Sequence, residues 1–167
     1  MKHTDIIQKL NLEQKCALLS GETVFTTRAL PGKGIPAITL SDGPNGVRKQ
    51  AGAADHLGLN PSVPATCFPT AATIANSWDE KLGEEIGTAL AEEAVTMDVN
   101  VILGPGLNIK RSPLCGRNFE YFSEDPYHAG KMAAAYVKGI QSKGISACPK
   151  HFAANSQELR RLSLIHI

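Results

Sequence analysis

The sequence predicts an α/β protein built on a parallel sheet, and two observations support this fold class. Segments with helical periodicity alternate with short apolar runs, and each apolar run ends in Gly, Pro or Asp. That alternation is typical of βα units, in which helices connect parallel strands. The chain has 167 residues, which suits a single domain, and it shows no internal repeat and no low-complexity linker.

Three helices are predicted from their capping residues and apolar periodicity, at 11–21, 77–97 and 125–144. The first two begin at patterns typical of a capping box, 11–14 and 77–80. Asp125 followed by Pro126 begins the third, with the acid as cap and the proline in the first turn. The charged face of the second helix, with Glu84, Glu85, Glu92 and Glu93, is expected to be solvated.

Three apolar runs are predicted as short buried strands, at 36–40, 99–103 and 145–148. A polar cluster follows each of them. Because the carboxyl ends of parallel strands meet at one edge, we expect Asp42, Asn108, Lys150 and His151 to be neighbours. A further cluster at 116–120 follows the second strand and should overhang the same edge.

The side chains expected at this edge suit a neutral ligand with many hydroxyl groups. Each sugar hydroxyl donates and accepts, so carboxylates and cationic donors can bind neighbouring hydroxyls together. A phosphate site would need a glycine-rich loop that leads into a helix N-terminus. The run at 104–106 is too short for such a loop and contains a proline, so a nucleotide site is rejected.

The composition favours a soluble protein without nucleic acid or membrane partners. Apolar residues make up 43% and charged residues 20%, and the net charge is +1 with no basic block. No signal peptide is recognised, and no apolar run approaches the ~18 residues that span a bilayer, so we expect a cytoplasmic protein. The four cysteines lack zinc-binding spacing and are expected to be reduced and buried. We expect no metal and no cofactor.

Four sequence blocks carry distinctive motifs, at 41–48 (Ser-Asp-Gly-Pro-Asn-Gly-Val-Arg), 65–69 with 77–79, 103–126, and 150–158. In this order they resemble the blocks of glycoside hydrolase family 3 and its β-glucosidases. The resemblance covers residues 1–161 and implies the N-terminal portion of a TIM-type (β/α)8 barrel. A complete barrel needs roughly 200 residues or more, so we expect this one to be incomplete and the chain to be a truncated fragment.

The resemblance also implies the roles of individual residues. In the family, the matching positions bind the sugar at the subsite where the bond breaks, and here they are Asp42, Arg48, Arg117, Lys150 and His151. Glu120 is expected to orient a cationic side chain without contacting the sugar. Asn108 is likewise expected to support the sugar-binding residues rather than to bind the sugar itself. The Asp nucleophile and the acid/base of the family would lie beyond Ile167, so the chain alone is expected to be inactive.

The implied activity is that of a retaining β-glucosidase acting on terminal non-reducing β-D-glucosyl residues of a β-glucoside or oligosaccharide. The run 152–155 departs from the Pro-Gly-His-Gly motif of members that cleave N-acetylglucosamine. Likewise, residues 116–120 read Gly-Arg-Asn-Phe-Glu, whereas the motif at this position in xylosidase-like members is similar to Gly-Arg-Gly-Gln-Glu. The alternatives are a β-xylosidase or other exo-glycosidase of the same family, or a non-catalytic sugar-binding fragment.

The last residues, 162–167, read Leu-Ser-Leu-Ile-His-Ile and resemble the translation of a transposase-end sequencing adapter. We therefore expect 1–161 to be the N-terminal part of the barrel domain and 162–167 to be a non-native tail. The codons of the nucleotide sequence test this hypothesis, because other codons there would contradict it.

Several further residues receive structural rather than functional interpretations. His128 is expected to be solvated or incidental, and Trp78 to pack in the core or at its rim. Tyr121 and Phe122 are expected to anchor a loop.

Overall fold

The computed structural model describes residues 2–52, 60–152, 154–156 and 158. Within them lie all the predicted helices and strands and every predicted site residue. The proposed tail at 162–167 lies outside the described residues.

Three strands form one parallel sheet in the order β1-β2-β3, which is also their order along the chain. They are β1 (Leu40–Asp42), β2 (Val101–Leu103) and β3 (Ser146–Ala147). Leu40 aligns with Val101, and Val101 with Ser146. Each strand therefore adds beside its predecessor after a helical crossover, which is the connection repeated around a (β/α)8 barrel.

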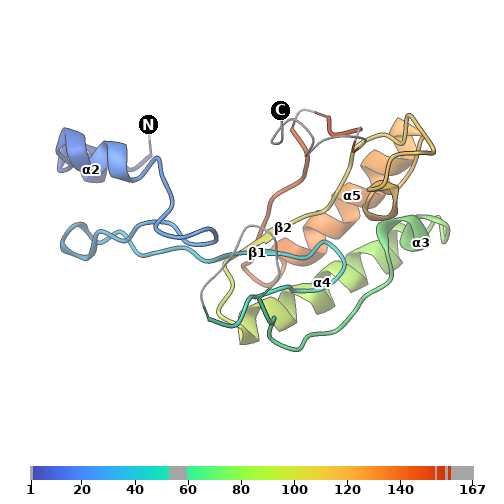
Figure 1. The fold of residues 1–167 in the computed structure, drawn as a ribbon, viewed down its shortest axis with the longest axis horizontal. Helices are drawn as coiled ribbons and strands as arrows, with labels where there is room; N and C mark the ends of the chain where they lie inside the picture. Colours follow the sequence, from blue (N-terminus) through green and yellow to red (C-terminus); the bar gives the residue numbers. More distant parts are fainter. Residues whose placement is uncertain (1, 53–59, 153, 157, 159–167) are drawn as a thin grey trace.

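The longest helices are α4 (Glu80–Thr96) and α5 (Pro126–Gln141), which run side by side next to the sheet (Figure 1). The shorter helices are α1 (Thr4–Gln8), α2 (Leu12–Ala17) and α3 (Ala71–Ala75), with 3-10 turns η1 (Pro31–Lys33) and η2 (Asn118–Glu120). Helices α1 and α2 bury no residue, and in Figure 1 they lie apart from the sheet.

The predicted caps are confirmed for α2 and α5 and wrong for α4. Asn11 forms a capping box at α2, and the Asp125 side chain accepts from the Tyr127 amide at α5. Helix α4 is capped by Asp79 rather than Ser77, since Asp79 Oδ1 accepts from the Lys81 amide at 2.8 Å. Ser77 instead accepts from the Asp79 amide and shapes the turn before the helix.

The first strand begins later than the sequence predicts, at Leu40 rather than residue 36. Before it, Ile38 pairs with an N-terminal segment instead of with β2, whereas the Thr39 carbonyl already accepts from the Val101 amide at 3.1 Å. The Leu40 amide donates to the Phe25 carbonyl at 2.8 Å, and the Thr27 amide donates to the Ile38 carbonyl at 3.0 Å. The strand also ends later than predicted, because Asp42 pairs with Leu103 and is its last residue rather than part of the loop that follows.

The core lies between the sheet and the two long helices. Ile102 of β2, Leu90 of α4, and Met132, Tyr136 and Ile140 of α5 are almost completely buried there. The apolar stripe predicted for the third helix is therefore confirmed, and it sets the position of the strand ends that carry the polar clusters.

His128 is buried rather than solvated, which corrects the sequence prediction. It is 7% exposed, its Nε2 lies 2.9 Å from the Ala75 carbonyl oxygen, and its ring stacks on Trp78 with 3.9 Å between centroids. Trp78 covers the imidazole from outside while remaining 71% exposed, so it lies at the rim. The bond to Ala75 explains the burial, because it satisfies a ring nitrogen without water.

The cysteine prediction is right only for Cys115, which is buried. Cys16, Cys67 and Cys148 are exposed. Cys16 lies on α2, which buries no residue, so its exposure follows from the position of that helix.

Candidate functional site

A cleft of about 340 Å³ opens at the carboxyl edge of the sheet. Its charged lining residues come from three separate parts of the chain, namely Asp42, Arg48, Arg117, Glu120 and Lys150. Four of the five residues that the sequence assigns to sugar binding therefore line one cavity.

A tight turn after β1 places Arg48 beside Asp42. The Arg48 amide donates to the Asp42 carbonyl oxygen at 2.8 Å, which closes the loop 43–47. Gly43 has φ 129° in this turn, and a Cβ there would overlap the Gly46 carbonyl oxygen and lie 3.0 Å from the Arg48 nitrogen. Only glycine fits that position, so the Asp-Gly pair brings both side chains to the same cleft.

The short turn η2 orients Arg117 and Glu120 toward each other. The guanidinium Nε of Arg117 forms an ion pair with Glu120 Oε1, three residues further along the chain. Glu120 is 3% exposed, so its carboxylate lies beneath the cleft rather than at its mouth. Arg117 is also near Glu158, at 3.7 Å from Nη1 to Oε1.

Lys150 connects the carboxylates of the site. Its Nζ lies 3.3 Å from Asp42 Oδ1 and 3.2 Å from Glu120 Oε2. Its amide donates to the Pro105 carbonyl and its carbonyl accepts from the Leu107 amide, so the backbone is fixed beside the end of β2. Asp42, Lys150, Glu120 and Arg117 thus form one chain of alternating charge, in which each oxygen of Glu120 holds a different cation.

His151 lines a neighbouring groove and contacts the cleft through Arg117. Its Nε2 lies 2.9 Å from Arg117 Nη2, and its Nδ1 lies 3.0 Å from the Tyr121 hydroxyl. Its amide donates to Asn108 Oδ1 at 2.7 Å. The groove holds about 450 Å³ and is more apolar, with Leu107, Ile109 and Phe152 among its lining residues. Asn108 is buried and fixes the backbone of His151 through this hydrogen bond, and its supporting role in sugar binding stays a prediction.

The electrostatic environment keeps Arg117 charged and Tyr121 protonated. Partial burial lowers the pKa of Arg117, but the hydrogen bond and charge of Glu120 outweigh it, so the pKa is raised overall. Burial raises the pKa of Tyr121. Both groups therefore remain hydrogen-bond donors at neutral pH.

Among the described residues, no cluster of three or more His, Cys, Asp or Glu side chains could hold a metal ion.

Tyr121 is the site residue that the sequence does not reveal. The sequence predicts a loop anchor, and Tyr121 is indeed 1% exposed. Its hydroxyl, however, contacts His151, 30 residues away in the chain. The only sequence signal is its position directly after Glu120, which does not show the direction of the hydroxyl.

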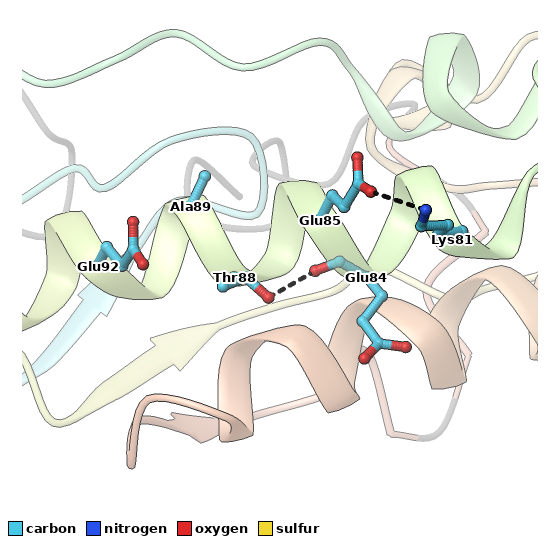
Figure 2. Close-up of a pocket in the computed structure, with 6 residues that line it drawn as sticks. All are labelled: Lys81, Glu84, Glu85, Thr88, Ala89 and Glu92. Carbon is cyan, nitrogen blue, oxygen red and sulfur yellow. Dashed lines mark hydrogen bonds and ion pairs between the residues drawn. The ribbon is translucent and has the colours of Figure 1, made fainter.

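A third hollow, on α4, carries no convergent chemistry. Figure 2 shows its lining residues on that one helix, where Lys81 forms an i,i+4 pair with Glu85 at 3.8 Å. The predicted solvated face is confirmed for Glu84, Glu85 and Glu92, which are exposed. Glu93 departs from it, since its carboxylate accepts from the Thr66 amide at 3.1 Å.

The described residues form three successive parallel strands with a polar cleft at their carboxyl ends, which is the arrangement of the βα units of an α/β barrel. Residues 34–160 match the model of the glycosyl hydrolase family 3 N terminal domain. The chain therefore belongs to glycosyl hydrolase family 3, as the four sequence blocks predict.

Curated relatives include two kinds of glycosidase. The chain is 55% identical to thermostable beta-glucosidase B of Acetivibrio thermocellus over 159 residues, which are 95% of this chain and 21% of that enzyme. It is 51% identical to an exo-alpha-(1->6)-L-arabinopyranosidase of Bifidobacterium longum, over 93% of this chain and 21% of that enzyme. The chain thus spans about a fifth of the length of these relatives.

Solved structures share the fold. A GH3 beta-glucosidase of Bifidobacterium adolescentis has a TM-score of 0.83 and 49% identity, covering 93% of this chain and 22% of that chain. The beta-glucosidase of Kluyveromyces marxianus in complex with glucose has a TM-score of 0.86 and 41% identity, covering 92% of this chain and 18% of that chain. The predicted fold class, the N-terminal portion of a TIM-type barrel, is confirmed. Among the described residues, no helix has the length and apolar character needed to cross a bilayer.

Proposed function

We propose that the chain supplies much of the glucose-binding subsite of a retaining β-glucosidase that acts on terminal non-reducing β-D-glucosyl residues. The observation that carries this proposal is the cleft in which Asp42, Arg48, Arg117 and Lys150 converge. Asp42 offers acceptor oxygens, while the three cations offer donors, and a sugar ring presents hydroxyls that need both. Membership of family 3 and the beta-glucosidases among its relatives support the same conclusion.

The carboxylates of the cleft are placed to bind rather than to cleave. A retaining glycosidase needs two carboxyl groups about 5–5.5 Å apart, one as nucleophile and one as acid/base. Both oxygens of Glu120 are engaged by cations beneath the cleft, and Asp42 is paired with Lys150. Within the described residues, Asp42 is the one carboxylate of the cleft that a ligand can reach, because Glu120 is 3% exposed, whereas double displacement needs two.

The purified chain is expected not to hydrolyse an aryl β-glucoside above the uncatalysed rate. Release of nitrophenolate from p-nitrophenyl β-D-glucoside measures this directly, with a heat-denatured sample as the blank. Turnover that scales with the concentration of the native chain would contradict the binding-only role.

Replacing Asp42 with Asn is expected to weaken glucose binding roughly 10- to 150-fold, because a charge-assisted hydrogen bond to a hydroxyl contributes roughly 1.5–3 kcal/mol. Isothermal titration calorimetry with D-glucose measures the change. Asp98→Asn is the matched control, since Asp98 is exposed, has φ 52° and lies before β2, away from the strand ends. Asparagine tolerates that backbone conformation. Equal affinity of both variants would remove Asp42 from the subsite.

A pentopyranoside is the second candidate substrate class. The observation that favours it is the 51% identity to exo-alpha-(1->6)-L-arabinopyranosidases over 93% of this chain. The same calorimetric titration distinguishes the two, with L-arabinose and D-glucose as ligands. Tighter binding of glucose supports the glucosidase assignment, and tighter binding of L-arabinose supports the second candidate.

A further inference from the structure

The ring nitrogens of His151 have different partners, and those partners determine where its proton lies. Arg117 Nη2 lies 2.9 Å from Nε2. A guanidinium has donors only, so Nε2 must present its lone pair to Arg117. A neutral His151 then carries its hydrogen on Nδ1.

An independent constraint from the other side of the ring gives the same answer. The Tyr121 hydroxyl donates to the Asn155 carbonyl oxygen at 3.2 Å, and a carbonyl only accepts. Because the hydroxyl has a single hydrogen, its contact with Nδ1 at 3.0 Å requires the His151 N–H to donate to the tyrosine oxygen. Raising of the Tyr121 pKa by burial keeps that hydroxyl protonated.

The Tyr121 ring is held firmly enough to impose this arrangement. It is 1% exposed, and its backbone bridges to Gly106 beyond the end of β2. A Cβ on Gly106 would lie 2.9 Å from Tyr121 Cδ1, so the ring packs directly on that backbone. The tyrosine and histidine rings meet edge to face, with 6.0 Å between centroids.

We propose that Tyr121 is a positioning residue of the sugar subsite, which holds His151 as the neutral Nδ1–H tautomer. Nε2 then accepts from Nη2 of Arg117 and fixes the guanidinium at the edge of the cleft, where its remaining N–H groups donate to a sugar hydroxyl. The inference deepens the proposed function and rests on it. Without the tyrosine hydroxyl, the tautomer with Nε2–H becomes accessible, and that hydrogen would face the donor Nη2 of Arg117 and displace the guanidinium.

Long-range ¹H–¹⁵N NMR on the histidine-labelled 167-residue chain tests the proposal, with His151→Gln to assign the signals. In the parent chain at neutral pH, Nε2 of His151 should resonate as an unprotonated ring nitrogen. Tyr121→Phe should increase the Nε2–H tautomer and weaken D-glucose binding about fivefold to tenfold. Tyr127→Phe is the matched control, because Tyr127 is 73% exposed on α5 and its replacement should change neither quantity.

The outcomes separate the two levels of the proposal. A protonated Nε2 in the neutral parent chain overturns the inference, and that measurement needs no variant to fold. An unchanged tautomer in a folded Tyr121→Phe chain overturns it as well. The expected tautomer in a chain that binds no sugar would support the positioning of His151 and overturn the proposed function.

Discussion

Replacing Glu120 with Gln is expected to lower the free energy of unfolding by about 3 kcal/mol, because it leaves two partly buried cations without their shared counter-charge. Glu120 Oε2 forms an ion pair with Lys150 Nζ at 3.2 Å, and Oε1 pairs with Arg117. Glutamine keeps the size of the side chain but has a single acceptor oxygen, so its amide nitrogen must face one of the two cations. The carboxylate is almost fully buried, so water cannot replace what is lost.

Urea unfolding followed by circular dichroism measures the effect of Glu120→Gln. Glu85→Gln is the matched control, because Glu85 is exposed and forms a 3.8 Å surface pair with Lys81. Such surface pairs contribute about 0–1 kcal/mol. If Glu120→Gln and the control had the same free energy of unfolding, the buried carboxylate would not stabilise the fold through its two ion pairs.

Replacing Gly139 with Ala is expected to destabilise the chain by about 2–3 kcal/mol through overpacking between α4 and α5. A Cβ at Gly139 would overlap the Glu84 carbonyl oxygen and lie 2.7 Å from the Thr88 nitrogen. Both atoms belong to the backbone of α4, so the helices must separate rather than a side chain rotate. Gly87 of α4 packs in the same way against α5, since a Cβ there would overlap the Tyr136 carbonyl oxygen. The two glycines therefore set the distance between the helices.

Gly130→Ala on the same helix is the control for Gly139→Ala. Nothing lies within 4 Å of a Cβ built at Gly130, and the residue is exposed. Alanine there should stabilise the chain by roughly 0.5–1 kcal/mol through helix propensity. Thermal unfolding of the two variants should therefore shift in opposite directions. A shift in the same direction would mean that the contact between α4 and α5 relaxes at little cost.

Local features of the fold could be predicted where they depend on residues a few positions apart. The Asn11 and Asp125 caps and the apolar stripe of α5 are examples, since each depends on contacts within about four residues. The error at the first strand has the opposite origin. Residues 36–38 are apolar enough for a strand, but the backbone of Ile38 hydrogen-bonds to Thr27 in the N-terminal segment, which no local pattern indicates.

The candidate site divides in the same way. Asp42 and Lys150 could be predicted as neighbours, 108 residues apart, because parallel strands end at a common edge. The sequence could not predict that Glu120 lies between Lys150 and Arg117 in the row of alternating charges. It also could not predict that His151 lines the neighbouring groove rather than the cleft. Strand ends identify which residues meet, whereas side-chain directions depend on how the turn η2 packs against them.

The sequence by itself determined the alternation of helices and strands, the family, and the residues gathered at the carboxyl edge of the sheet. Those features depend on local periodicity, caps and motif spacing. Only the tertiary structure decided that Glu120 lies buried between Lys150 and Arg117, that His128 is covered by Trp78, and that Tyr121 faces His151. Each of those contacts exists because packing of the turn η2 or of α5 fixes where a side chain can reach its hydrogen-bond partner.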